Sequence, residues 1–278
     1  MDATISNKKM IKTFIKSISE LKKIGTDVTF VICENDLSIQ CINNTQTILP
    51  IIKFNASAFS EYDYLSNRPR ITLQIVASNF CSCFRHISSP TKLVIRIDEE
   101  TQSLHFHVYD RFGIIHHVNI FTSKARGRFI TAQSVKTLFI SIDAKQLLKT
   151  QKSFKSAYIG LSADYSGENE QISFRSYCDE KNGTSKLIMR QSCLCEIKIE
   201  KNGTKPVLFS STDFVMALRI AKLANETAEF NVSAPGMPLL VTATNKMNSV
   251  SVECSLATMT EANQDSVLPF EGEEKSDE

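Results

Sequence analysis

Four of the five histidines lie in a short stretch of the sequence, where they could bind a metal ion together. His105 and His107 alternate along one expected strand, and His116 and His117 lie on the next. A hairpin between these strands could bring some of the imidazoles together. No nearby cysteine or carboxylate completes an obvious set of ligands, so we expect surface positions on strands, no metal ion and no other cofactor.

The acidic residues form no recognisable catalytic pattern. Asp98, Glu99 and Glu100 are consecutive, so they cannot all face one metal ion from a strand, and they are typical of a turn. A nuclease needs separated acids that hold two metal ions. The sequence has no phosphate-binding loop, no G-x-S-x-G motif and no H-E-x-x-H motif. We therefore predict no catalytic residue and no enzymatic activity.

The eight cysteines favour a reducing compartment rather than a disulfide framework. Two pairs, Cys81/Cys83 and Cys193/Cys195, have C-x-C spacing instead of the C-x2-C spacing of a zinc knuckle. The other four stand alone in apolar segments. We interpret all eight as core or surface thiols, with metal binding and redox chemistry as the alternatives.

The composition is that of a folded chain with a divided charge. Of the 278 residues, 42% are hydrophobic, which suits one large domain or two of ordinary size. No apolar run reaches the roughly 20 residues that span a bilayer, so no membrane association is expected. Residues 261–278 hold seven acids and one base, a net charge of −6, which leaves +8 on residues 1–260. The basic body suggests an anionic partner.

Apolar periodicity predicts two helices and a run of strands in each half of the chain. The first helix begins after Ser6 or Asn7 and ends before Gly25. The other helices are expected at Ala77–Ile87, Asp143–Ser153 and about Thr212–Ala224, the last capped by Ser211 or Thr212. Segments bounded by turn residues predict strands at Val28–Cys33, Leu37–Ile42, Ile48–Phe54, Lys92–Ile97, Ser103–Tyr109, Ile114–Phe121, Thr137–Ile142, Ala157–Ala163, Gln171–Tyr177, Lys186–Arg190, Leu194–Glu200, Ala228–Val232, Leu239–Thr244 and Val250–Leu256.

The order of these elements repeats, which indicates an α+β duplication. Each half is expected to pack two helices on antiparallel sheet. We place the first domain at 1–121, an interdomain connector at 122–136, the second domain at 137–260 and an acidic disordered tail at 261–278. Two unrelated α+β domains are the alternative.

Basic residues gather on the exposed side of the expected helices. In the first helix Lys9, Lys12, Lys16 and Lys23 lie opposite the apolar side, with Glu20 near the edge of this stripe. A stripe of one charge sign repels itself and often serves a polyanion. The other helices repeat the pattern more weakly, with Arg85, Lys145, Lys149, Lys152, Arg219 and Lys222.

For any one helix an ordinary solvated face is the alternative, and the repetition in all four favours a shared function. No aromatic residues interleave with these bases, which argues against stacking on single-stranded bases. We therefore predict sequence-independent contacts to the phosphates of double-stranded DNA.

The helices and closing strands together resemble the clamp family of proliferating cell nuclear antigen. Within that family the sequence is similar to the Rad-nine-type subunit of the heterotrimeric nine-one-one checkpoint clamp. The shared order of the segments is the specific feature of the likeness. The segments are MIKTFIKSISELKKIGTDVTF, CINNTQTILPIIKFNASAFSEYDY, NFCSCFRHI, FGIIHHVNIF, VLFSSTDFVMALRIAKLA, FNVSAPGMPLLVTA and VSVECSLATM.

The resemblance implies two tandem clamp domains in a ring of three related subunits, with the helices lining a hole for duplex DNA. It also implies two other clamp subunits, a clamp loader, signalling to checkpoint kinases, DNA repair and a location in the nucleus. The 3′–5′ exonuclease activity ascribed to members of this family stays open as an alternative. A replicative homotrimeric processivity clamp and a free-standing DNA-binding module are further alternatives.

Two strands are expected at sheet edges, where free backbone groups can pair with a strand of another subunit. One lies around Ile114–Phe121 and the other around Lys186–Arg190. The predicted interface residues are Ile114, Ile115, Val118, Ile120, Leu187 and Met189.

The end of the sequence, SVLPFEGEEKSDE, resembles the tip of the phosphorylated tail of this type of subunit. Ser276 directly precedes Asp277 and Glu278, a context that suits an acidophilic kinase, and Ser266 is the second candidate. Phosphate would add charge and acceptor oxygens for a phosphopeptide-binding checkpoint mediator. A purely solubilising tail is the alternative.

Overall fold

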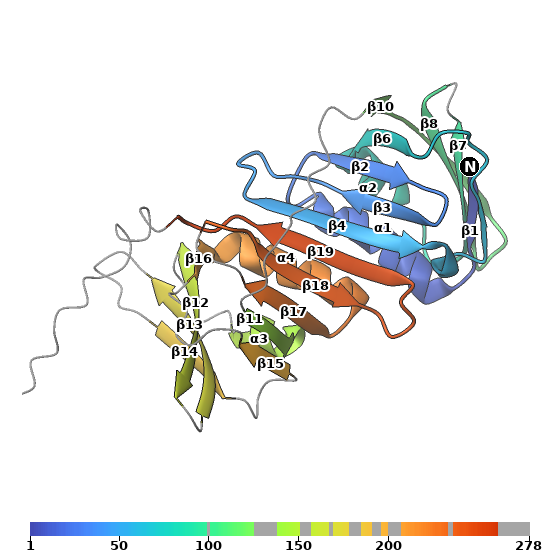
Figure 1. The fold of residues 1–278 in the computed structure, drawn as a ribbon. Coiled ribbons are helices and arrows are strands. Elements are labelled where there is room, and N and C mark those ends of the chain that lie inside the picture. The colour runs from blue at the N-terminus through green and yellow to red at the C-terminus, as the bar shows by residue number, and fades with distance from the viewer. Residues whose placement is uncertain are drawn as a thin grey trace, which may run out of the picture.

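The computed structural model describes residues 1–98, 101–124, 138–150, 157–166, 169–177, 185–190, 196–199, 207–232 and 236–260. In these ranges the chain forms four α-helices on antiparallel sheets (Figure 1). The helices are α1 (Lys8–Leu21), α2 (Ala77–Phe84), α3 (Ala144–Thr150) and α4 (Ser211–Ala224), with a short 3-10 turn η1 (Ala56–Ala58). Within the described ranges, no helix has the length and apolar character needed to traverse a membrane.

The largest sheet has ten strands and runs through both halves of the chain. Its centre is the antiparallel pair β4 (Ile48–Asn55) and β19 (Val250–Leu256), which places the last strand of the second half against the first half. From one edge to the other the strands are β10 (Ser123–Lys124), β6 (Ile71–Val76), β2 (Asp27–Ile32), β3 (Asp36–Gln40), β4, β19, β18 (Leu239–Thr244), β17 (Thr227–Val232), β11 (Leu138–Asp143) and β15 (Glu196–Ile199).

Each half also has a smaller antiparallel sheet of its own. In the first half five strands lie in the order β5 (Glu61–Asp63), β1 (Asp2–Ile5), β7 (Pro90–Asp98), β8 (Ser103–Asp110) and β9 (Ile115–Phe121). In the second half the order is β14 (Ser185–Arg190), β13 (Asn169–Tyr177), β12 (Tyr158–Ser166) and β16 (Val207–Ser210). Strands β9 and β14 therefore each lie at the edge of a sheet.

The four helices lie together on one side of the ten-stranded sheet, behind it in the view of Figure 1. Helix α1 packs against α2 on one flank and α4 on the other, and α4 packs against α3. The row of helices therefore runs α2, α1, α4, α3 and crosses from one half of the chain to the other.

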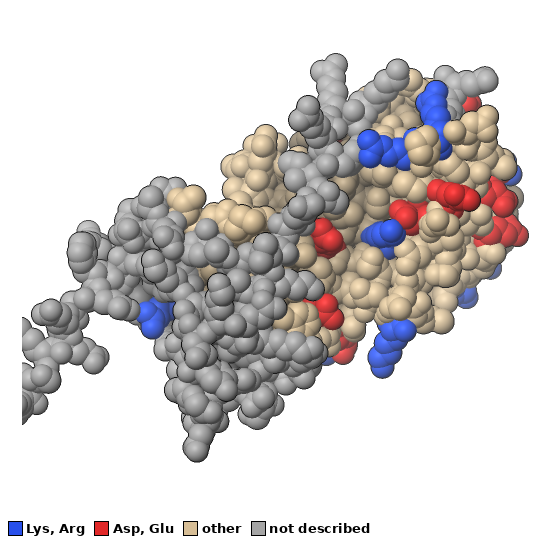
Figure 2. Space-filling view, in the orientation of Figure 1, with Lys and Arg blue, Asp and Glu red and all other residues tan. Residues whose placement is uncertain are grey.

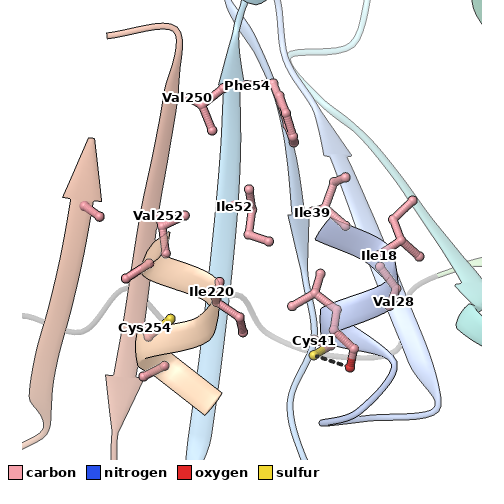
Figure 3. Close-up of a cluster of buried hydrophobic side chains, with 14 of the residues drawn as sticks. Ile18, Val28, Ile39, Cys41, Ile52, Phe54, Ile220, Val250, Val252 and Cys254 are labelled. Carbon is pink, nitrogen blue, oxygen red and sulfur yellow. Dashed lines mark hydrogen bonds between the residues drawn. The ribbon is translucent and has the colours of Figure 1, made fainter. Parts of the chain in front are cut away.

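The core fills the space between the helices and the sheets. Phe14 of α1 is buried, with its ring centroid 5.3 Å from that of Phe54 in β4. Figure 3 shows Ile52 of β4 between Ile39 on the α1 side and Ile220 on the α4 side. Full burial of such a side chain contributes about 1.5–3 kcal/mol. Strand β4 therefore contributes core side chains under both central helices.

The predicted α+β architecture, with two helices per half packed on antiparallel sheet, is confirmed, although some element boundaries differ. Asn7 caps α1, because its Oδ1 accepts from the backbone N–H groups of Lys9 and Met10. The cap of α4 is Ser210 rather than Ser211 or Thr212, since its hydroxyl accepts from the N–H of Asp213 at 3.3 Å.

The boundaries of the other two helices also differ from the prediction. Helix α2 ends at Phe84, before Ile87, and α3 begins at Ala144. The carboxylate of Asp143 accepts from the N–H groups of the second and third residues of α3, so Asp143 precedes the helix as its cap. The described part of α3 ends at Thr150, and the predicted end at Ser153 lies outside the described residues.

Several short strands were not predicted. Strands β1, β5, β6 and β16 carry three to six residues each and acquire their partners from distant parts of the chain. Strand β10 lies inside the expected connector, where Ser123 pairs with Gln74 of β6. The start of the connector therefore extends the first half's part of the sheet, and the domain limits themselves stay predictions.

Candidate DNA-facing helices and subunit edges

The lysine stripe of α1 lies on the side of the helix that faces away from the core. Lys9, Lys12 and Lys16 are exposed, whereas Phe14 and Ile18 are fully buried. Because 3.6 residues make one turn, positions 9, 12 and 16 share one face of the helix. The three ammonium groups therefore form a row on the outer surface of α1.

Lys23 differs from the other three predicted lysines of this helix. It lies after the end of α1, and its Nζ is 2.7 Å from Oε2 of Glu20. The sequence interpretation placed Glu20 only near the edge of the stripe. An exposed ion pair of this kind is weak, at about 0–1 kcal/mol, so Lys23 stays available to a stronger anion.

The other helices add exposed cations on the same side of the ten-stranded sheet. Arg85 directly follows α2, Lys145 and Lys149 lie on α3, and Arg219 and Lys222 lie on α4. All five are exposed. The predicted Lys152 lies outside the described residues. Since the four helices form one row, these cations and those of α1 belong to one continuous surface, which we call the helix face.

Acids are scarce on the helix face. Within the four described helices the only acids are Glu20 and Asp213, and each has a partner. Glu20 pairs with Lys23, and Oδ2 of Asp213 accepts a hydrogen bond from Thr47 at 2.6 Å. The helices hold eight lysines and arginines: Lys8, Lys9, Lys12, Lys16, Lys145, Lys149, Arg219 and Lys222. This excess of positive charge suits a polyanion.

The opposite face of the molecule has a different character. In the described part of the side that Figure 2 shows, the surface is mostly uncharged, and acidic residues lie among the basic ones. Lys53, for example, lies 2.9 Å from Oδ2 of Asp36. The described part of this side therefore lacks the positive excess of the helix face.

The four predicted interface residues in and just before the edge strand β9 fall into two sets. Ile114 and Ile115 are 54% and 43% exposed, whereas Ile120 is only 4% exposed and Val118 is half-buried. Alternation along the strand turns Val118 and Ile120 toward the core. Their side chains therefore pack inside the molecule, and only their backbone groups lie at the edge.

The sequence interpretation missed two aromatic residues at this edge. Phe112 in the turn before β9 is 67% exposed, and Phe121 at its end is 81% exposed. Large exposed apolar side chains beside an edge strand, which has one side without a neighbouring strand, mark an interaction surface. A search for exposed aromatic residues at hairpin ends could have found Phe112, whose neighbour Gly113 indicates a turn.

The second predicted edge is β14, which within the described residues pairs only with β13. Leu187 lies opposite Phe174 and Met189 opposite Ile172 in the register of this pair. The backbone of β14 is thus at the edge of its sheet, as the interface hypothesis requires. The phosphorylation candidates Ser266 and Ser276 lie outside the described residues.

The histidines are split between the two faces of the hairpin. His107 and His117 lie opposite each other on the outer face, while His116 points the other way and lies 3.5 Å from the carboxylate of Asp110. In the part of the chain that the structure describes, no three His, Cys, Asp or Glu side chains are placed to hold a metal ion.

The buried cysteines and the acid-rich turn offer no reactive group. Burial raises the pKa of Cys41 to about 12 and that of Cys254 still further, so both thiols stay protonated. Asp98 accepts hydrogen bonds from the backbone and hydroxyl of Thr101, as expected for a turn. Glu99 and Glu100 lie outside the described residues.

Solved structures of proliferating cell nuclear antigen (PCNA) have a similar fold. The chain is similar to one in the PCNA2–PCNA3 complex of Sulfolobus tokodaii, with a TM-score of 0.75, 12% identity and coverage of 93% of this chain and 99% of that one. For PCNA of Entamoeba histolytica the TM-score is 0.74 and the identity 15%, with coverage of 92% of this chain and 98% of that one. For PCNA of Thermococcus kodakaraensis the TM-score is 0.74 and the identity 14%, with coverage of 92% of this chain and 99% of that one. The fold is therefore that of a PCNA-like DNA clamp.

The match to a family model is more specific than the likeness of fold. The Rad9 family model matches residues 14–259, and the chain belongs to the Rad9 family. The predicted resemblance is confirmed. The chain is a sliding-clamp subunit that acts in DNA-damage checkpoint signalling and DNA repair, in association with DNA and other clamp subunits.

Proposed function

We propose that this subunit occupies one place in a ring of three different subunits and contacts duplex DNA through the helix face. The observation that carries the proposal is the charge of that face. The four described helices hold eight cations but only two acids, and both acids already have partners. Exposed lysines and arginines without interleaved aromatic residues favour phosphate contacts that do not depend on base sequence.

The proposed contacts come from side chains on all four helices and are expected to act together. Each phosphate that the ring neutralises releases condensed counterions. The logarithm of the binding constant therefore falls with the logarithm of the salt concentration, with a slope of about 0.9 per phosphate contact. The proposed DNA-binding residues are Lys9, Lys12, Lys16, Lys23, Arg85, Lys145, Lys149, Lys152, Arg219 and Lys222. A monomer presents only a third of such a ring, so weak binding before ring closure is part of the proposal.

The experiment is charge reversal of Lys12 and Lys16 together, in the assembled clamp on a closed circular DNA. We expect a shorter lifetime on DNA and a salt dependence that is shallower by about 0.9 for each lost phosphate contact. Lys92→Glu with Lys246→Glu is the matched control, because Lys92 lies in β7 and Lys246 in the turn between β18 and β19, outside the four helices. Equal retention of the Lys12/Lys16 variant and the wild type would contradict the proposal.

Ring assembly is proposed to use β9 and β14, one with each neighbouring subunit. Support comes from their position at sheet edges and from the exposed side chains of Phe112, Ile114, Ile115 and Phe121 beside β9. Ile115→Asp should weaken association with one partner while Ile42→Asp, an exposed residue of the β3–β4 loop, should not. Mass measurement by light scattering of the three mixed subunits distinguishes these outcomes, and a stable homotrimer of this chain alone would argue against a heterotrimeric ring.

The subunit is further proposed to be a nuclear scaffold without catalytic activity, loaded by a clamp loader. Support for a scaffold comes from the family and from the protonated, buried thiols described above. A nuclease assay with Mg²⁺ and Mn²⁺ on the pure protein tests the absence of exonuclease activity. Degradation that persists through purification and responds to an Asp or Glu substitution would overturn it.

The tail is proposed to recruit a phosphopeptide-binding checkpoint mediator through phosphorylated Ser276, with Ser266 as second site. A phosphate adds about −1.5 to −2 charge and acceptor oxygens that an Arg or Lys pocket can bind. Replacement of both serines by alanine should reduce damage-dependent kinase activation and leave clamp loading intact. Unchanged signalling would leave the tail with only a solubilising role.

A further inference from the structure

The outer face of the five-stranded sheet carries a histidine pair outside the helix face. His107 of β8 lies directly opposite His117 of β9 in the antiparallel register. Their ring centroids are 4.6 Å apart and the rings are inclined by 71°. Directly opposed side chains on one face of a sheet have Cβ atoms about 4.5–5.5 Å apart. One nitrogen of each ring can therefore reach a common ion.

The surroundings of His107 disfavour the charged form of its imidazole. Burial lowers the pKa of His107, and the neighbouring charges of His117, Arg96 and His105 lower it further, while Asp2 opposes them. An imidazole with a pKa below its ordinary value is neutral at pH 7 and offers a lone pair. His105 is engaged differently, because its Nε2 lies 2.7 Å from the hydroxyl of Ser103.

The surrounding charges are compatible with a bound cation. Arg96 is paired with Asp2, with Nε and Oδ2 3.4 Å apart. A hollow of about 210 Å³ beside His107 is lined by the carboxylates of Asp2, Glu61 and Asp63 and by the cations of Lys92 and Arg96, and His117 lies outside it. The three carboxylates outnumber the two cations of this hollow.

The number of protein ligands decides which metal suits the pair. A structural zinc site takes four protein ligands, and no third residue of a ligating type converges here in the described ranges. Cu²⁺ and Ni²⁺ accept square or tetragonal geometry with nitrogen and water ligands, and Cu²⁺ binds most strongly among the divalent first-row ions. Two imidazoles with the remaining positions filled by water therefore favour these ions.

We propose that His107 and His117 form a two-histidine clip that binds one Cu²⁺ or Ni²⁺ ion and ties β9 to β8. The clip is independent of the DNA contacts proposed for the helix face. It lies on the strand that forms the edge of the sheet, so a bound ion stabilises that edge against fraying. Metal binding here requires both imidazoles, because each alone supplies only one ligand.

The test is a calorimetric titration of the full chain, produced without a polyhistidine tag, with CuSO₄ or NiCl₂ at pH 7.5. Cys83→Ser serves as the background, since the exposed Cys83 thiol is itself a ligand for copper. We expect one ion per chain and a rise in melting temperature. His107→Asn and His117→Asn should each weaken binding by on the order of 10²-fold, because the second imidazole binds intramolecularly.

Two matched variants separate the clip from unspecific binding. His86→Asn and His105→Asn remove exposed or half-exposed imidazoles outside the pair and should leave the affinity within about threefold. Affinity should also fall when the pH drops to 5.5, because protons compete for the same nitrogens. No one-to-one binding, or equal loss in the His86 variant, would overturn the proposal. Glutamine at position 117 replaces asparagine if circular dichroism shows a folding defect.

Discussion

At the scale of single residues, Asp110 shows how one side chain holds the turn before β9. Its Oδ1 accepts from the backbone N–H groups of Phe112 at 2.8 Å and Ile114 at 3.0 Å. Burial by itself would raise the pKa of Asp110, but these N–H groups and the nearby His116 outweigh burial, so its pKa lies below the ordinary value. The folded state therefore favours the ionised carboxylate.

This direction predicts the pH dependence of stability. A carboxyl group with a lowered folded pKa stabilises the fold above its unfolded pKa and loses that contribution as the pH falls through the folded pKa. We expect Asp110→Asn to lower the free energy of unfolding at neutral pH, and the difference from wild type to shrink below about pH 4. Urea unfolding between pH 3 and pH 7 measures this difference.

Glu34→Gln provides the control, because Glu34 is an exposed loop acid. It should change the free energy of unfolding little at any pH. A difference for Asp110→Asn that stays constant from pH 7 to pH 3 would show that the carboxylate charge has no role in the turn.

At the scale of elements, the hairpins β3–β4 and β18–β19 share one turn design in different halves of the chain. Oδ1 of Asn245 accepts from the N–H groups of Ser249 at 2.8 Å and Val250 at 3.1 Å. Asn43 makes the corresponding pair of hydrogen bonds at the turn before β4. These turns set the register of β4 and β19, the two strands that join the halves.

We predict that Asn245→Ala lowers the free energy of unfolding by about 1–3 kcal/mol, because two backbone N–H groups lose their acceptor. Thermal and urea unfolding measure the loss. Asn248→Gly in the same turn is the matched control and should be nearly neutral, since Asn248 has a φ of 52° that glycine adopts without strain. Equal destabilisation by both changes would contradict the role of the Asn245 side chain.

At the scale of the whole molecule, the halves are joined by side chains as well as by the β4–β19 pair. The hydroxyl of Thr47, in the β3–β4 loop, donates to Oδ2 of Asp213 in the first turn of α4 at 2.6 Å. A hydrogen bond to a charged group is worth about 1.5–3 kcal/mol. This contact ties the start of α4 to the other half of the chain.

A double-mutant cycle tests this connection. Thr47→Val and Asp213→Asn should each destabilise the protein, with a coupling energy of about 1 kcal/mol or more. Thr45→Val combined with Asp213→Asn should give a coupling near zero, because Thr45 bonds to Asn43 and Thr47 instead. A coupling energy for Thr47 that is no larger than for Thr45 would show that the Thr47–Asp213 hydrogen bond does not help to join the two halves.

Much of the helix face could be predicted because helical periodicity is a local property of the chain. The spacing of Phe14 and Ile18 fixes the buried side of α1, and the lysines at positions 9, 12 and 16 must then lie on the other side. The structure places every described cation of the predicted set on the exposed surface. The assignment of these residues to DNA remains a prediction.

The subunit edge was only partly predictable, since exposure at an edge depends on neighbours from elsewhere in the chain. The sequence grouped Ile115 with Ile120, although alternation in β9 turns one outward and the other into the core. Phe121 was passed over because a single aromatic residue at a strand end does not reveal whether anything covers it.

The sequence by itself determined the helices, the longer strands and the separation of a basic body from an acidic end. Each of these depends on residue type and spacing over a few turns or one strand. Only the tertiary structure decided that β1 lies between β5 and β7, that β10 extends β6 and that β19 pairs with β4. The backbone groups of a strand are alike in every sequence, so the partner of a strand is selected by how the whole core packs.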